Sequence, residues 1–348
     1  MTKYEIAFVH LGNSLPKYLE LNIIRTHELF PDPEITLISD VNHVEKKFLT
    51  SHKYVRSGTT DSILLQTKHD ANFREGFWIK SLERLIAVLE YQIAQKRMNV
   101  IHIESDVLLM PNAPLEEVAR LDFPTWTKYS SSKSVGAIFF VPTPESAQKI
   151  LFAIWELIRK RPDITDMTIL NVLAEELKLG TTFSHSALDV SPISEESSVE
   201  YFHLNRGIFD PAQIGMWLTG EDPRNHLGMN VIHLNHLYTS GDSAINPEKL
   251  RFSLDSENNL WATNTAGGRF PIWSLHIHSK NVELFRDFQG TQLQKFVDAS
   301  SNIIIQRKIS IRNLLSLILS NTKNRTLLSY TRSAWKYLKM HRINRDSN

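Results

Sequence analysis

Two acidic side chains, Glu104 and Asp106, stand two residues apart at the end of an apolar segment. The preceding residues 99–103 (NVIHI) predict a buried strand, in which positions i and i+2 point to the same side. In open α/β sheets, ligands bind beyond the carboxyl ends of the strands. Carboxylates there suit a hard cation, Mg²⁺ or Mn²⁺, that also binds substrate phosphates. The alternative is a pair of solvated acids at a strand end.

A second group of candidate ligands lies late in the chain, where residues 271–278 (PIWSLHIH) predict a strand. His276 and His278 would share one face of that strand, and one imidazole would complete a metal shell. Lys280 follows closely and would hold a phosphate as a point charge. The alternative is a buried core histidine beside a solvated lysine.

Two predicted helices carry further charged candidates. Lys80 and Arg84 lie one turn apart on a helix expected over 76–94, so they could meet an anionic ligand together. Asp166 opens a helix expected over 166–179, where an acid is also favoured by the helix dipole alone. The residues from Asp210 to Asn225 are rich in Asp, Asn, Gly and Pro, which suits recognition of hydroxyl-rich ligands or ordinary turns.

The elements that must position these residues alternate along the first half of the chain. Strands are expected at 4–11, 34–39, 99–103 and 135–141, and helices at 15–30, 76–94 and about 145–160. This order predicts an α/β fold with a mostly parallel central sheet flanked by helices. Residues 181–270 predict loops with short strands, and basic helices are expected from 302 onward.

Composition excludes several classes of protein. Of 348 residues, 42% are hydrophobic and 22% are charged, which is typical of a globular chain. The absence of cysteine excludes disulfide scaffolds, thiolate zinc sites and cysteine nucleophiles. The N-terminal apolar run is too short for a signal peptide, and no segment approaches the ~20 apolar residues of a spanning helix. We therefore expect a cytoplasmic protein.

The order of these motifs resembles the GT-A nucleotide-diphospho-sugar transferase superfamily over residues 4 to 281, and in particular uncharacterised bacterial surface-polysaccharide glycosyltransferases. The triplet 104–106 takes the place of the superfamily's Asp-x-Asp, with Glu in the first position. Residues 166–171 (DMTILN) resemble the Asp-Gln-Asp-x-Leu-Asn helix start of a retaining branch typified by glycogenin and lipopolysaccharide galactosyltransferases. That branch also has a late His that binds the metal and a nearby Lys that binds the diphosphate.

The resemblance implies a Rossmann-like GT-A fold and a metal-dependent, hexosyltransferase-like enzyme. It would move a sugar from a nucleotide-diphosphate donor, with a UDP-sugar as first guess, to a glycan or lipid-linked acceptor. Met167 and Thr168 replace the Gln and Asp of the helix motif, so retention or inversion stays open. The implied catalytic domain spans residues 1–300, of which residues 1–110 would bind the nucleotide and residues 111–300 the acceptor. A basic helical appendage, residues 301–348, would follow it.

The site residues that follow fall into three groups. Asp106 and Asp166 are the catalytic candidates. Mn²⁺ or Mg²⁺ would be held by Glu104, Asp106 and either His276 or His278, with His278 favoured for its proximity to Lys280. The donor nucleotide and its phosphates would contact Val9, His10, Gly12, Asn13, Asp40, Lys80, Arg84, Glu104 and Lys280.

Two other functions compete with this interpretation. A non-catalytic nucleotide- or glycan-binding protein, or a scaffold of polysaccharide assembly, would explain the altered helix motif. A nucleotidyltransferase usually carries a Gly-rich, basic loop after its first strand. Residues 11–16 (LGNSLP) contain one glycine and no arginine, which counts against that class.

The end of the chain is strongly basic. Residues 307–348 contain ten Lys and Arg against one acid, Asp346, interspersed with Leu, Ile, Trp and Tyr. Basic amphipathic helices of this kind bind anionic membrane surfaces, which would suit a lipid-linked acceptor and a peripheral location on the inner face of the membrane. Alternatively, the helices pack on the acidic body or bind a partner. No nucleic-acid recognition motif accompanies the charge.

Deletion of residues 306–348 tests the membrane interpretation. We expect the truncated chain to lose sedimentation with anionic phosphatidylserine vesicles, because the basic residues supply the attraction to the lipid surface. Neutral phosphatidylcholine vesicles are the control. Unchanged binding to the anionic vesicles after deletion would contradict the interpretation.

Overall fold

The centre of the fold is a set of parallel strands that are apolar on both faces. In this parallel centre, β1 (Glu5–His10) pairs with β2 (Glu34–Ser39) on one side and with β4 (Val100–Ile103) on the other. Residues 6–9 of β1 are all buried, as expected for a strand covered on both faces. The computed structural model describes residues 3–12, 14–40, 46–69, 76–183, 206–220, 222 and 245–303.

The larger sheet has the strand order β3-β2-β1-β4-β7-β6-β8. Among the described strands of this sheet, β7 alone runs antiparallel to its neighbours. The predicted α/β fold with a mostly parallel sheet is therefore confirmed. The other four strands of this sheet are β3 (Leu49–Lys53), β6 (Thr125–Lys128), β7 (Ser134–Val141) and β8 (Thr181–Phe183).

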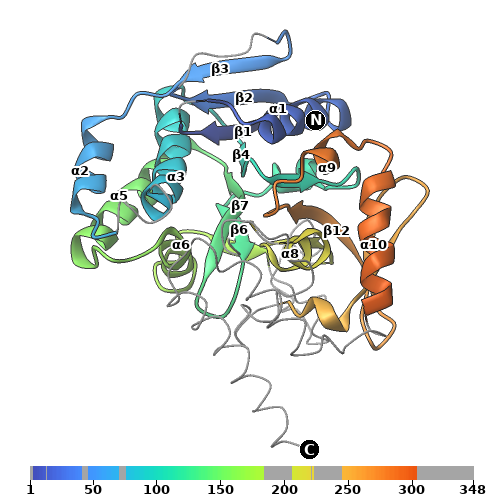
Figure 1. Ribbon diagram of the computed structural model, residues 1–348. Coiled ribbons are helices and arrows are strands. Elements are labelled where there is room, and N and C mark those ends of the chain that lie inside the picture. The colour runs from blue at the N-terminus through green and yellow to red at the C-terminus, as the bar shows by residue number, and fades with distance from the viewer. Residues whose placement is uncertain are drawn as a thin grey trace, which may run out of the picture. The chain divides into compact units, whose positions relative to one another are not determined.

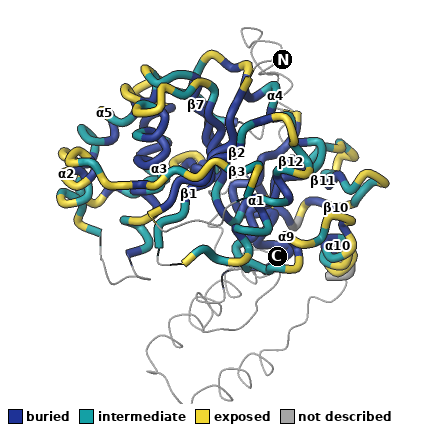
Figure 2. Tube along the Cα trace, turned by 90° about the horizontal axis from the view of Figure 1, so that it is seen from above, coloured by how far each residue is buried: buried dark blue, intermediate teal, exposed yellow. Residues whose placement is uncertain are grey.

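Helices cover both faces of this sheet, and the alternation along β1 shows which helix lies on which face (Figures 1 and 2). Ala7 and Val9 belong to one apolar cluster, and Ile6 and Phe8 belong to another. The first cluster includes side chains of α3 (Phe77–Ala94), α5 (Pro144–Lys160), α6 (Asp166–Glu175) and α2 (Gly58–Gln66). The second includes α1 (Lys17–Leu29) and α4 (Leu115–Val118).

A smaller sheet begins where β4 ends. After the turn 104–106, the chain enters β5 (Val107–Leu109), which pairs antiparallel with β12 (Arg269–His276). The sheet continues through β11 (Leu260–Thr263) to β10 (Arg251–Leu254), and β9 (Ile208–Phe209) pairs with β12. Its apolar cluster is shared with α8 (Gln213–Thr219) and α9 (Val282–Arg286), and η4 (Pro247–Lys249) lies beside α8.

Two predicted elements end earlier than expected. The helix expected over 166–179 ends at Glu175, and Lys178 beyond it has a left-handed φ of 52°. The strand expected over 271–278 ends at His276, where the chain turns and the His278 N–H donates to the His276 carbonyl. The short strands β3, β10 and β11 were not predicted individually: exposed polar residues hide the apolar alternation in β3 and β10, and β11 has only four residues.

The chain divides into compact units 1–297 and 298–348. Of the second unit, the structure describes residues 298–303, the end of α10 (Thr291–Ile303). The basic helices expected beyond that point lie outside the described residues, and the division at 110 stays a prediction. Among the described helices of this chain, none has the length and apolar character needed to cross a membrane.

The central strand β7 offers a test of the fold. Phe140 is fully buried opposite Ile101 of β4, so Phe140→Ala should destabilise the protein by about 3–5 kcal/mol. Phe152→Ala on α5 is the matched control, because its side chain is 61% exposed and the expected change is within about 0.5 kcal/mol. Urea unfolding measures both, and equal effects of the two changes would contradict the described core.

Candidate metal centre

The turn between β4 and β5 is anchored by a buried asparagine. Asn22 of α1 is fully buried, and its Nδ2 donates to the carbonyls of Ser105 (3.1 Å) and Val107 (2.8 Å). The Glu104 N–H donates to Ala137 O at 3.1 Å, which ties the turn to β7 as well. These contacts use the backbone of the turn, so the carboxylates of its two acids remain available for a ligand.

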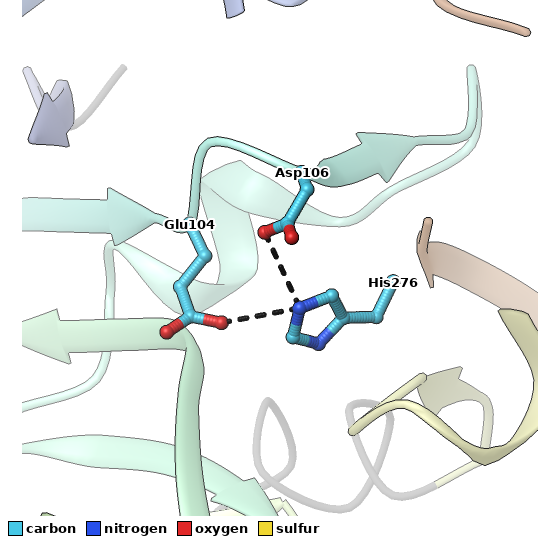
Figure 3. Close-up of side chains that lie close together, drawn as sticks. All are labelled: Glu104, Asp106 and His276. Carbon is cyan, nitrogen blue, oxygen red and sulfur yellow. Dashed lines mark ion pairs between the residues drawn. The ribbon is translucent and has the colours of Figure 1, made fainter. Parts of the chain in front are cut away.

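The last residue of β12 brings an imidazole to these two carboxylates. His276 stands opposite Val107 in the register of β12 with β5. Its Nε2 lies 3.3 Å from Glu104 Oε2 and 3.3 Å from Asp106 Oδ1, and Figure 3 shows both carboxylates pointing toward the ring. One ligand atom from each of the three residues lies within 4.8 Å of the others. Such a set of two oxygens and one nitrogen fits a divalent cation.

The two candidate histidines differ in this geometry. Because β12 ends at His276, His278 lies beyond the strand and not on it as expected. The two rings lie 4.3 Å apart, and burial, followed by the charge of His276, lowers the pKa of His278 to about 3. Among the described residues, the group that could hold a metal contains His276 and not His278. The geometry thus favours His276 over the preferred His278, and the metal ligand itself stays a prediction.

Cationic groups surround the acidic turn. Lys280 Nζ lies 3.9 Å from Asp106 Oδ2 and 3.8 Å from Asp222 Oδ2, over the ring of Tyr18. On the other side, Arg84 Nη2 donates to Glu104 Oε1 at 3.2 Å. The sequence prediction placed both cations at the donor phosphates, and the structure places both beside the acidic triplet.

The electrostatics of the centre follow from this proximity. Burial opposes ionisation of Asp106, but His276 and Lys280 outweigh it and hold the pKa of its carboxyl far below the usual range. Burial also disfavours the imidazolium of His276, yet Asp106 and Glu104 raise its pKa to about 9. The proton on His276 thus supplies a positive charge at the position where a cation would supply it, so protons and a metal compete there.

Asp166 lies close to this cluster at the start of α6. The Thr165 hydroxyl caps the helix by accepting from the Thr168 N–H at 3.3 Å. The Asp166 Oδ1 is buried and has no hydrogen-bond partner among the described residues. Burial, followed by repulsion from Glu104, raises the pKa of this carboxyl to about 6. Thr165 caps the helix and Asp166 lies in its first turn, where the helix dipole favours an acid.

The predicted nucleotide contacts gather at the ends of β1 and β2. The Gly12 N–H donates to Asp40 Oδ1 at 3.0 Å, and His10 Nε2 lies 2.8 Å from Ser14 O. Burial lowers the pKa of His10, and the charges of Arg84 and Lys80 lower it further, which puts both cations near this edge. The side chain of Val9 is instead buried in the core cluster under α3, and Asn13 lies outside the described residues.

The segment expected to form an acceptor loop is largely interior where it is described. Asp210 is fully buried, and every residue of α8 is buried as well, so this segment is not an exposed loop. Residues 221 and 223–225 lie outside the described residues.

Sequence reasoning missed Asn22, because a single polar residue on a helix gives no sequence pattern that indicates its distant partner. The Asp-Pro pair at 210–211 before an apolar run was a usable cap signal.

A scan against protein-family models gave no match, and a search of curated proteins gave none. A search of solved structures found similarity to a crystal structure of an active-site mutant of LgtC, a GT-A glycosyltransferase. The identity is 12%, the TM-score is 0.38, and the match covers 60% of this chain and 85% of that chain. We therefore infer function from the residues of the site itself.

The raised pKa of Asp166 predicts a pH-dependent effect of Asp166→Asn. Because the folded-state pKa is raised, the native carboxyl holds its proton longer than the unfolded one, and its ionisation costs stability as pH rises from about 4 to about 6. The variant should gain stability relative to the parent across that window, by up to about 1.4 kcal/mol per pH unit, and no further above it. Urea unfolding between pH 4 and 7.5 measures this, and parallel curves would contradict it.

Proposed function

We propose that this chain is a metal-dependent GT-A glycosyltransferase that moves a sugar from a nucleotide-diphosphate donor to a glycan or lipid-linked acceptor. The observation that carries the proposal is the convergence of Glu104, Asp106 and His276 at the carboxyl end of β4. Ligands bind at this edge of open α/β sheets. The acids and the histidine come from distant segments of the sequence, which favours a built site over a chance run of surface acids.

Mn²⁺ or Mg²⁺ is the cofactor we propose, held by these three side chains. When bound, a divalent cation offsets negative charge on the departing diphosphate. Lys280 lies beside the Asp106 carboxylate and would contact the diphosphate as a second positive group. Arg84 holds Glu104 through a charge-assisted hydrogen bond, which orients that carboxylate toward the centre.

The remaining residues would bind the two ends of the donor. We propose that His10, Gly12 and Asp40 contact the base and ribose, since they meet at the ends of β1 and β2. Asp166, at the start of α6, would orient the donor sugar or the acceptor hydroxyl. In the transfer, the bond from the anomeric carbon to the diphosphate oxygen breaks, and its electron pair stays on the diphosphate. The oxygen of the acceptor hydroxyl forms the new bond to the same carbon, and its proton passes to the departing diphosphate or to water.

The acceptor would be bound by residues 111–300, and residues 306–348 would hold the enzyme at an anionic membrane surface. A lipid-linked acceptor favours such a location, because the acceptor then diffuses in the same two-dimensional layer as the enzyme. A UDP-sugar is the first donor to test.

Nucleotide titration with and without metal tests the proposal. We expect UDP, GDP or CMP to raise the melting temperature only together with Mn²⁺, since a ligand that binds the native state stabilises it by about 2.7 kcal/mol at 100 times Kd. Asp106→Asn should abolish the joint effect. Asp163→Asn, which changes an exposed aspartate, is the matched control and should leave it intact.

Turnover separates the enzyme from a binding protein. With the nucleotide that gives the joint shift, release of that nucleotide from the matching sugar nucleotide should require Mn²⁺ and Asp106. Tight metal-dependent binding with no turnover in the presence of candidate acceptors would favour a non-catalytic nucleotide- or glycan-binding protein. Absence of any nucleotide shift would overturn the proposal.

A further inference from the structure

A short segment packs directly behind His276, on the side of the ring away from the acidic turn. β9 runs parallel to β12, with Phe209 opposite Ser274, and the Asp210 N–H donates to the Ser274 carbonyl at 3.3 Å. The chain then turns through Pro211 into α8. The described residues thus bring the start of α8 against the end of the strand that carries the candidate ligand.

The carboxylate of Asp210 joins these two elements through four hydrogen bonds. Its Oδ1 accepts from the N–H groups of Ala212 (3.1 Å) and Ile214 (3.0 Å). Its Oδ2 accepts from the N–H groups of Gly215 (2.7 Å) and His276 (3.1 Å). Asp210 is fully buried, so water does not take the place of this acceptor if the carboxylate is lost, and the N–H groups are left without a partner.

The same segment holds the far side of the imidazole. His276 Nδ1 lies 3.3 Å from the carbonyl oxygen of Pro211, which can only accept a hydrogen bond. In the neutral ring, with the one proton on Nδ1, the lone pair of Nε2 points to Glu104 and Asp106, as a metal ligand requires. The tautomer that binds a metal is therefore selected by a backbone group that Asp210 holds in place.

The fit between the two elements leaves no room for a side chain at position 215. A Cβ on Gly215 would stand 2.1 Å from the carbonyl oxygen of His276. This close approach lets one short carboxylate reach both the helix start and the strand end.

We infer that Asp210 is a positioning residue for His276: its carboxylate and the adjacent Pro211 carbonyl set the place and the tautomer of the imidazole without contacting the metal or the donor. The inference rests on the proposed function, because it assigns a role toward the same metal centre. The segment 210–215 would then hold one ligand of that centre in place.

Mn²⁺ binding to the full chain tests this role. Asp210→Asn keeps the size of the side chain, but either orientation of its amide turns an NH₂ group toward two N–H donors. We expect roughly 10–100-fold weaker Mn²⁺ binding in calorimetry, the usual effect of losing a group that orients a ligand. Pulsed electron paramagnetic resonance should show ¹⁴N coupling from an imidazole on Mn²⁺ in the parent, and weakened or lost coupling in the variant.

The matched control is Asp255→Asn. Asp255 also accepts four hydrogen bonds, two of them from backbone N–H groups, but all come from residues 257–261, in its own turn and at the start of β11. This variant should lose some thermal stability and keep the parent's Mn²⁺ affinity and ¹⁴N coupling. Gly215→Ala, which forces α8 away from His276, is the second test should Asp210→Asn fail to fold, and it should weaken the coupling in the same direction.

The outcomes separate the two proposals. If the parent binds no Mn²⁺, or binds it without ¹⁴N coupling, the metal centre of the proposed function is wrong. If the parent binds Mn²⁺ with ¹⁴N coupling, and Asp210→Asn or Gly215→Ala shows the same affinity and coupling as the parent, the positioning role is overturned while the metal centre stands.

Discussion

The pairing of β5 with β12 is the constraint on which the candidate metal centre depends. β4 belongs to the larger sheet and β5 to the smaller one, so the turn between them lies where the two sheets meet. The register sets His276 opposite Val107, and the Ile277 N–H donates to the Asp106 carbonyl at 2.7 Å. A slip of one residue would turn the imidazole to the other face of the strand. The backbone pairing of β5 with β12 therefore decides which side chain lies beside Glu104 and Asp106.

Charge balance is the second requirement of this arrangement. Two carboxylates held together in a partly buried turn repel one another strongly, and the repulsion grows as water is excluded. Arg84 offsets part of this charge on Glu104, and Lys280 offsets part of it on Asp106. The imidazolium of His276 stands between the two acids. A divalent cation at this position would offset the same negative charge. The position that the His276 proton occupies between the two carboxylates is therefore also suited to a metal ion.

Two buried polar residues hold the centre without belonging to it. Asn22 supports the acidic turn from α1, and Asp210 supports the end of β12 from the start of α8. Burying either polar side chain costs free energy unless the side chain forms hydrogen bonds inside the protein. Each satisfies backbone groups of the turn or strand that it supports. Rigid support of this kind narrows the positions open to the ligand atoms.

The amino-acid sequence by itself determined the local elements and the place of the acids. Apolar alternation and helical spacing marked β1, β2, α3 and β4, and the strand before Glu104 put the triplet at a sheet edge. The tertiary structure decided which histidine faces those acids, because the end of β12 depends on its pairing with β5 and on the turn after it. It also buried Asp210, which was expected in a loop, and gave Asn22 its partners, the carbonyls of Ser105 and Val107. Hydrophobic periodicity is a property of neighbours in the chain, whereas strand ends, buried hydrogen bonds and shifted pKa values arise from groups that only folding brings together.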